Sequence, residues 1–283
     1  MHRISLNVLA GVLAVPLLTA GSGGVALAQG KLDARYTASL AGIPIGHGAW
    51  FVDIGDDKYL AAASGTTAGL MRLFSSGEGT GAARGSIVNG QLLPSTYAAS
   101  ITADRKTSEV RMTLGGGDVK TFAVSPPSKP DPGRVPLTES SRRGVLDPMT
   151  GSIYRIAAGE DPMTPSACSR NIAIFDGRMR YDLHLAFKRI DHVKAAKGYA
   201  GPVLVCAVYF DPIAGHIPDR MAIKYLTGLR SMEAWLAPIA GTSVLVPYRF
   251  EIPTPVGLGL LQATQFVTAV QRTRPTPTAA KGH

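Results

Sequence analysis

The stretch Asn171-Ile-Ala-Ile-Phe-Asp-Gly-Arg-Met-Arg-Tyr-Asp-Leu-His-Leu-Ala-Phe-Lys188 decides the fold class of this chain. Its Asp176-Gly177 pair is typical of a two-residue type I′ turn, which joins the arms of a β-hairpin. Apolar and polar side chains alternate along the second arm, as in a strand with one buried face. The apolar positions are Tyr181, Leu183, Leu185 and Phe187, and the polar positions are Arg180, Asp182, His184 and Lys188. The stretch therefore predicts an antiparallel hairpin.

Further strands are expected on the C-terminal side of this hairpin. The run Val203–Phe210 is continuously apolar, which predicts a strand covered on both faces. Lys224–Leu236, Val244–Ile252 and Leu258–Val270 are predicted to follow as strands, with a turn at Thr254–Gly257.

The N-terminal half predicts a β-meander with short helical interruptions. Its expected strands are Arg35–Leu40, Ala49–Ile54, Lys58–Ala63, Leu92–Ile101, Glu109–Leu114 and Val119–Val124. The glycine-rich run Gly77–Gly85 is interpreted as a flexible hairpin connection. Apolar residues in Thr67–Phe74 have helical spacing, and Asp147 with Pro148 predicts the start of a helix over Met149–Ala158.

Composition indicates one β-rich domain over residues 29–270. Hydrophobic residues make up 45% of the chain and charged residues 17%, so a sizeable core can form. The 32 glycines and 20 prolines favour a turn-rich β architecture over a helical bundle. Residues 125–136 are proline-rich and are expected to connect two halves of the domain. Residues 271–283 are predicted to be a disordered tail.

Residues 1–28 have the pattern of a secretory signal peptide. A basic start precedes an apolar run at 8–18, and Ala26-Leu27-Ala28 predicts cleavage between Ala28 and Gln29. This apolar run is too short to cross a bilayer. We therefore expect a periplasmic protein that keeps no transmembrane anchor once the signal is removed.

Cys168 and Cys206 are the only cysteines, and they are predicted to form a disulfide. An even count in an oxidising compartment favours a bridge, and two cysteines allow one connectivity. The alternatives are a metal ligand or a nucleophilic thiol. Neither cysteine belongs to a C-x-x-C motif or has a histidine within a few residues, so the disulfide is favoured.

The net charge of +9 raises the question of an anionic partner. Phosphate groups of membrane lipid are one such partner, and charge that only maintains solubility is the alternative. Lys and Arg are dispersed along the chain, and the predicted export argues against nucleic acid, so no nucleic-acid partner is expected.

No sequence motif predicts a catalytic site, a cofactor or a metal. The chain has no G-x-S-x-G, S-x-x-K, H-E-x-x-H, P-loop or G-x-G-x-x-G sequence. The best candidate for a polar site is the face of the hairpin that carries Asp182 and His184. General acid–base chemistry would need these groups to be desolvated in a cleft. A solvated strand face explains them equally well.

Several motifs resemble an uncharacterised "domain of unknown function" family of exported Gram-negative bacterial proteins. They are Gly144-Val-Leu-Asp-Pro-Met-Thr150, Cys168 with Ile174-Phe-Asp-Gly-Arg-Met-Arg-Tyr-Asp-Leu183, Cys206 with Tyr209-Phe-Asp-Pro-Ile-Ala-Gly-His216, Trp235-Leu-Ala-Pro238 and Val246-Pro-Tyr-Arg249. The resemblance covers roughly Tyr36 to Phe266. It implies a fold similar to the lipoprotein carriers LolA and LolB and to β-spiral envelope-integrity proteins. In such a fold a long, curled antiparallel sheet, an open half-barrel, wraps around one to three short helices.

Three functions are compatible with the sequence. The first is a non-enzymatic periplasmic protein that maintains the envelope by binding a lipid-like ligand or an envelope partner. The second is an envelope hydrolase that uses Asp182 and His184. The third is a scaffold that binds a protein or peptidoglycan through a strand edge. Fold resemblance alone does not choose among them.

Overall fold

The computed structural model describes residues 29–68, 77–157 and 160–271. The predicted signal peptide lies outside these residues, as do most of the predicted helical cluster Thr67–Phe74 and residues 272–283 of the predicted tail. Among the described residues, the first strand starts at Gln29 and the last strand ends at Gln271.

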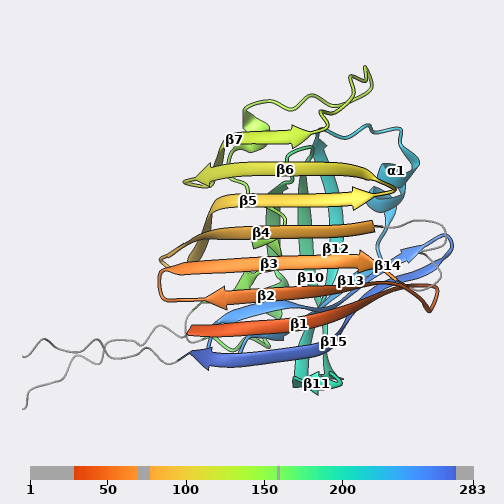
Figure 1. Ribbon diagram of the computed structural model, residues 1–283. Coiled ribbons are helices and arrows are strands. Elements are labelled where there is room, and N and C mark those ends of the chain that lie inside the picture. The colour runs from red at the N-terminus through yellow and green to blue at the C-terminus, as the bar shows by residue number, and fades with distance from the viewer. Residues whose placement is uncertain (1–28, 69–76, 158–159, 272–283) are drawn as a thin grey trace, which may run out of the picture.

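Seven strands form the N-terminal meander (Figure 1). They are β1 (Gln29–Leu40), β2 (Ile43–Ile54), β3 (Lys58–Thr67), β4 (Gly77–Val88), β5 (Gln91–Ala103), β6 (Lys106–Gly115) and β7 (Asp118–Ser125). Every expected strand of this half is present and is longer than predicted. The run Gly77–Gly85 is a strand and not a connection, because hydrogen bonding to β3 and β5 on both sides overrides its low strand propensity.

The C-terminal half contributes eight further strands and short helical segments. They are β8 (Tyr154–Arg155), β9 (Arg170–Phe175), β10 (Arg180–Lys194), β11 (Lys197–Gly198), β12 (Ala200–Ala214), β13 (Met232–Pro238), β14 (Val244–Thr254) and β15 (Gly257–Gln271). The helix is α1 (Met221–Gly228), and the 3-10 turns are η2 (Ser140–Arg142), η3 (Thr150–Ser152) and η4 (Pro165–Cys168).

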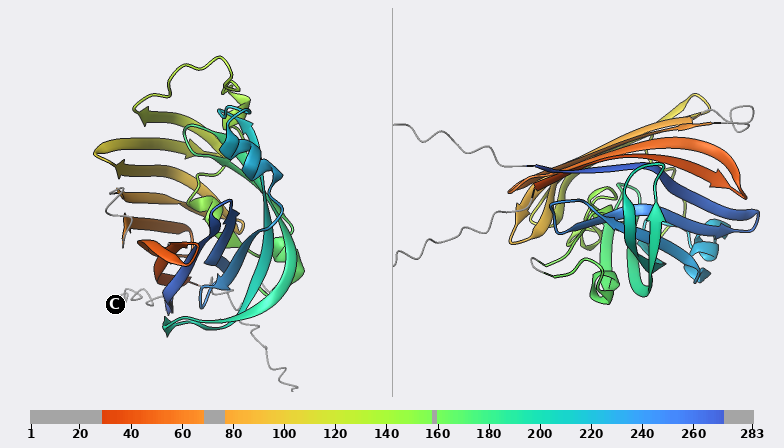
Figure 2. Two further views of the ribbon diagram at one scale, coloured as in Figure 1. Left: turned by 90° about the vertical axis from the view of Figure 1, so that its right-hand side faces the viewer. Right: turned by 90° about the horizontal axis from the view of Figure 1, so that it is seen from below.

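All these strands belong to one sheet of 15 strands that curls into an open half-barrel. Its order is β7-β6-β5-β4-β3-β2-β1-β15-β14-β13-β12-β10-β9, so β1 and β15 join the two halves. β1–β7 form one wall, the strands of the second half return as the other, and residues near 140–157 lie between them (Figure 2). This confirms the predicted curled antiparallel sheet.

The edge strands β7 and β9 do not pair with each other. The segment 144–146 lies between them, where Val145 N–H donates to Gly117 O and Leu146 N–H donates to Ala173 O. The β9–β10 loop also packs against β6 and β7, since a Cβ at Gly177 would lie 2.5 Å from Val110 Cγ1. The gap between β7 and β9 is therefore bridged by the segment 144–146 and the β9–β10 loop, and the sheet itself stays open.

β12 anchors the second half, as its apolar sequence predicts. Val203 and Val205 belong to one buried cluster, while Leu204, Cys206 and Val208 belong to another. Successive strand residues point to opposite faces, so β12 is covered on both faces.

Three further local predictions are wrong. The β9–β10 connection is a four-residue loop, Asp176–Met179, in which the Asp176 carboxylate accepts hydrogen bonds from Arg178 N–H and Met179 N–H. Lys224–Leu236 is not one strand, because its first part belongs to α1. Residues from Met149 form only the turn η3 before β8 begins, because β8 pairs with β14 and the chain must extend.

Candidate functional site: an apolar groove on the concave face

A groove of about 740 Å³ opens on the concave face of the sheet, at the end where β3 stops and β4 starts. This volume lies within the usual 300–1,000 Å³ of small-molecule sites. Strands β1–β5 form one side of the groove, and Met149, Pro247 and Leu261 contribute to the other. The lining is mainly apolar, and among the described lining residues Glu78 is the one carboxylate and His47 the one imidazole.

A row of glycines crosses three strands on this face. Gly48 pairs with Gly65, and Gly65 pairs with Gly79. The row lies four residues along each strand from Val52, Ala61 and Ala83, which are buried in the core. Because side chains alternate at period two, the glycines face the same side as these core residues. The wall of the groove therefore lacks side chains where the neighbouring sheet has them.

The backbone does not require glycine at Gly65 or Gly79. A Cβ at Gly65 would lie 3.5 Å from its nearest neighbour, His47 O, and one at Gly79 would lie 3.5 Å from Ile101 Cγ1. These are ordinary van der Waals contacts. By contrast, a Cβ at Gly85 would lie 2.1 Å from Leu93 O, so the close approach of β5 demands glycine there.

Glycine inside a strand costs stability, by roughly 0.5–1 kcal/mol relative to alanine. At Gly85 the packing of the two strands explains that cost. At Gly65 and Gly79 no such packing explains the cost. Glycine at these positions leaves open space beside the sheet, which is typical of a place where a ligand approaches the backbone.

Apolar side chains of the groove remain accessible. Ile101 is 58% exposed and Leu261 is 40% exposed. Trp50 also lines the groove, and its indole Nε1 is buried without a hydrogen-bond acceptor among the described residues. A buried N–H without an acceptor costs about 1–3 kcal/mol. The groove thus offers exposed apolar surface, and the Trp50 N–H lies buried beside it.

A buried polar network supports the turn that carries Met149. The Asp147 carboxylate, fully buried, accepts hydrogen bonds from Met149 N–H at 3.0 Å, Thr150 N–H at 2.9 Å and Thr150 Oγ1 at 2.6 Å. The Thr150 hydroxyl also bonds the Tyr59 hydroxyl at 2.7 Å. Asp147 therefore caps a turn, as its sequence context predicts, although the turn is η3 and not a longer helix.

Burial sets the ionisation of the groups around this network. It raises the pKa of Asp147, although the three hydrogen bonds oppose the shift. Burial, with the nearby Asp147 charge as a smaller cause, raises the pKa of Tyr97 to about 12. Tyr36 is also buried, and its hydroxyl donates to Pro247 O at 2.6 Å. The Asp147 carboxylate and the Tyr36 hydroxyl therefore both have hydrogen-bond partners within the protein.

Asp182 and His184 do not form a shared site. Asp182 pairs with Arg180 and accepts a hydrogen bond from Asn171 Nδ2 at 3.2 Å. The side chain of His184 is 46% exposed, and its Nε2 lies 3.9 Å from Asp211 Oδ2. Neither residue lines the groove. The structure thus places the two side chains against different partners.

The predicted disulfide is confirmed. Cys168 in η4 and Cys206 in β12 are bonded, with their Cα atoms 5.6 Å apart. Both residues are fully buried, which ties η4 to the central strand of the second half. In the described part of the chain, no cluster of three or more His, Cys, Asp or Glu residues suits a metal ion. The helices described there include none that is long and apolar enough to cross a bilayer.

Sequence reasoning missed the groove, although a signal for it exists. Gly77, Gly79 and Gly81 recur at every second position, and Ala63 and Gly65 do the same on the preceding strand. This spacing places small residues on one face of a strand, whereas a flexible loop would not be expected to show a two-residue repeat.

Comparisons with known proteins give a family and a distant structural likeness. The family model described as "Protein of unknown function (DUF3108)" matches residues 35–264. No curated protein matches the chain. A crystal structure of a beta-barrel-like protein of domain of unknown function DUF1849 from Brucella abortus is similar, with a TM-score of 0.48 and 9% sequence identity. The match covers 87% of this chain and 99% of that one.

Proposed function

The chain belongs to the DUF3108 family of proteins of unknown function, and we propose that it is a non-enzymatic protein of the cell envelope that binds a lipid-like ligand. The ligand's apolar chain would lie in the concave groove. The observation that carries this proposal is the glycine row beside exposed Ile101 and Leu261, on the wall of a groove of about 740 Å³.

The lining favours an apolar or amphipathic ligand over a polyanion. No Lys or Arg is among the described lining residues, so a nucleotide or sugar phosphate would lose its hydration without gaining a cation. An acyl chain needs only apolar contact, and the glycine row leaves room for it against the sheet.

Binding without catalysis fits the chemistry of the groove. The ionisable lining residues His47 and Glu78 lie between inward-facing residues, so alternation turns their side chains to the convex face. His47 accordingly contacts Thr37 of the neighbouring strand. The alternative hydrolase would need Asp182 and His184 to act outside this groove, where each side chain has a different partner.

The proposed compartment is the periplasm. A buried disulfide is typical of exported proteins, and the signal pattern in residues 1–28 predicts the same route. Carriage of a lipid-like ligand by a curled sheet would also be similar to the activity of LolA and LolB. An envelope protein or peptidoglycan as the partner remains the alternative hypothesis.

Titration with a fluorescent fatty acid, cis-parinaric acid, tests the proposal. Gly65→Val and Gly79→Val together would fill the groove with methyl groups while favouring the strand conformation. If each valine displaces one methylene of the ligand, at about 0.8 kcal/mol per methylene, affinity falls about 15-fold.

The matched control is Thr80→Val, one residue away on the opposite face of β4. It adds an apolar group to the same strand without entering the groove, so the affinity for the fatty acid should stay within twofold of the unmodified protein. Equal affinities in all three proteins, or no binding by the unmodified protein, would remove the support for a ligand in this groove.

A further inference from the structure

We propose that the open end of the groove is also a surface that docks on an anionic phospholipid bilayer. The residues of this docking surface differ from those that line the groove. These residues are the exposed tips of two hairpins, the start of α1 and a group of cations.

Four aliphatic side chains protrude at this end. Ile43 is 53% exposed, Val256 is 70% exposed, Leu258 is 38% exposed and Met221 is 86% exposed. The two hairpin tips lie side by side, since Ala41 N–H donates to Leu258 O at 2.9 Å. Single exposed aliphatic residues are normal on protein surfaces, but four of them at the same end of the sheet indicate a contact surface.

The strand register fixes where these tips lie. Leu40 pairs with Gly259, and Thr254 pairs with Gly257, so the β1–β2 and β14–β15 turns share one end of the sheet. This is the end where β3 stops, β4 starts and the groove opens (Figure 1). The Tyr225 hydroxyl donates to Pro253 O at 2.9 Å, which holds α1 there as well.

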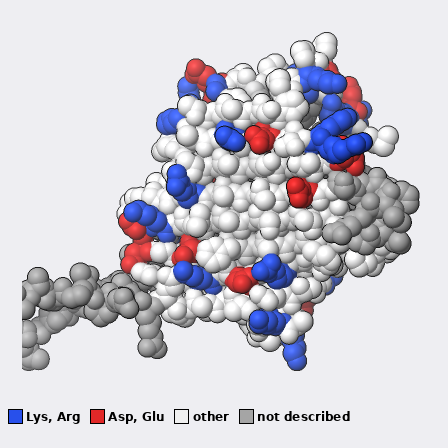
Figure 3. All heavy atoms as spheres, viewed as in Figure 1, with Lys and Arg blue, Asp and Glu red and all other residues white. Residues whose placement is uncertain are grey.

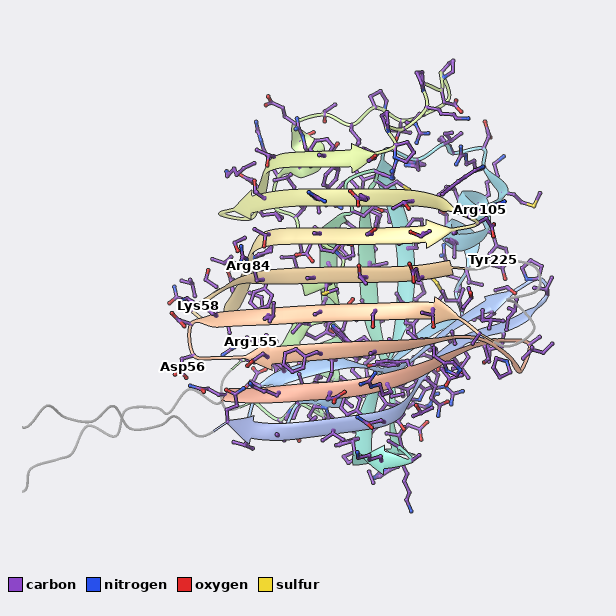
Figure 4. The ribbon with its side chains drawn as sticks, in the orientation of Figure 1. Asp56, Lys58, Arg84, Arg105, Arg155 and Tyr225 are labelled. Atoms are coloured by element: carbon purple, nitrogen blue, oxygen red, sulfur yellow. A yellow bond between two sulfur atoms is a disulfide. The ribbon has the colours of Figure 1, made fainter. Side chains whose placement is uncertain are left out.

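Cations that have no carboxylate partner in the described part of the chain lie at the same end, and one of them, Arg230, donates to Thr227 O and Leu229 O. In Figure 3, Lys and Arg side chains gather over the adjoining ends of β5 and β6, and Figure 4 labels Arg105 at this end of the sheet. In the described part of the chain, Arg105, Lys106, Arg220 and Arg230 form no ion pair with a carboxylate, whereas Lys224 pairs with Asp219. The carboxylates of Asp104 and Glu78 lie near this end, so the cations outnumber them.

Lys106 connects the cations to the groove. It pairs with Ala103 across the β5–β6 hairpin, and Ala103 lines the groove. Paired residues in an antiparallel sheet share a face, so Lys106 lies on the concave side. A cation at this position can reach a lipid headgroup while the acyl chain enters the groove.

Aliphatic tips with surrounding cations are the pattern of a protein that rests in the headgroup region of a bilayer. The aliphatic side chains insert a short distance, and Lys and Arg attract anionic lipid. A second copy of this chain would instead need about 800 Å² of complementary surface on each partner. The exposed aliphatic side chains come from two turns and a helix and do not form one continuous flat surface. A deformable bilayer can accommodate them more easily than the rigid surface of a second protein copy.

Co-sedimentation with vesicles tests the inference. The full chain without its predicted signal peptide would be mixed with vesicles of phosphatidylcholine and phosphatidylglycerol at 7:3, and with vesicles of phosphatidylcholine alone. Ile43→Ser with Val256→Ser should weaken binding to the mixed vesicles about tenfold. Arg105→Gln with Lys106→Gln should weaken it about fivefold per charge removed, on the anionic vesicles only.

The matched control uses the opposite end of the same sheet. Val88 and Val270 are 46% and 60% exposed there, so Val88→Ser with Val270→Ser removes similar apolar area. This control should bind vesicles within twofold of the unmodified protein. An equal loss in the control, or no sedimentation of the unmodified protein, would overturn the inference.

Two further measurements separate the possible outcomes. Sedimentation velocity that shows self-association, lost in the Ile43→Ser with Val256→Ser variant, would assign this end to a second copy and overturn the bilayer proposal. Binding of cis-parinaric acid is measured on the same samples. Retained fatty-acid binding without vesicle binding would refute docking while leaving the groove proposal intact, and the reverse result would refute the groove proposal alone.

Discussion

The Cys168–Cys206 disulfide holds the second half of the sheet together, and removing it is the most quantitative test of the fold. The variant is Cys168→Ala with Cys206→Ala, which leaves neither a buried thiol nor a buried hydroxyl. The bridge ties η4 to β12, whose residues Val203–Val208 are all buried between two apolar clusters.

The expected loss follows from the loop and the packing. The bridge spans 38 residues, for which the chain-entropy relation gives about 4 kcal/mol. Two removed sulfur atoms leave methyl-sized gaps in a fully buried region, at about 1 kcal/mol each. The free energy of unfolding should therefore fall by about 4–6 kcal/mol, and at 2–4 °C per kcal/mol the melting midpoint should fall by roughly 10–20 °C.

Thermal unfolding followed by far-UV circular dichroism measures this change. The unmodified protein in a reducing agent is the internal control, because it loses the cross-link but keeps both sulfur atoms. Its midpoint should lie between those of the oxidised protein and the double variant. A double variant that melts within about 3 °C of the oxidised protein would refute the reasoning.

Three more predictions follow from single sites. Gly85→Ala should lower the urea midpoint strongly, since its Cβ would lie 2.1 Å from Leu93 O. Asp147→Ala should cost at least about 2 kcal/mol in urea unfolding, because buried donors lose their acceptor. Burial raises the pKa of Tyr154 from 10 in the unfolded chain to about 12. The stabilisation that burial of the neutral phenol provides is fully present below pH 10 and is lost as the pH rises from 10 to 12, so the free energy of unfolding should fall over that range. Absorbance at 295 nm should show that Tyr154 ionises at a higher pH in the folded protein than in the unfolded chain.

The sequence predicts the fold well where side chains alternate or form continuous apolar runs. β10 and β12 carry such patterns, and burial of one or both faces determines their conformation. The meander strands follow for the same reason. The disulfide also follows from the sequence, because only two cysteines are present.

The errors occur where partners distant in sequence determine the structure. Gly77–Gly85 has low strand propensity, yet β3 and β5 supply hydrogen bonds on both sides. Lys224–Leu236 contains apolar residues with no clear period, and Tyr225 bonds Pro253 of a strand that follows later in the chain. Local sequence cannot contain either interaction.

The position of the groove could not be predicted for a related reason, although the two-residue spacing of glycines on β4 is visible in the sequence. Its wall consists of side chains that are missing from Gly48, Gly65 and Gly79, on three strands that meet only in the folded sheet. Composition identifies the glycines but not their alignment. Asp182 and His184, by contrast, are conspicuous in the sequence and have ordinary partners in the structure.

Native mass spectrometry of the protein purified without detergent or denaturant tests the central claim most directly. The account predicts a population heavier than the polypeptide by the mass of a lipid-like molecule that organic solvent extracts. That population should be strongly reduced in the Gly65→Val with Gly79→Val variant and unchanged in Thr80→Val. Spectra showing only the bare polypeptide in every preparation, or the same adduct in all three proteins, would contradict it.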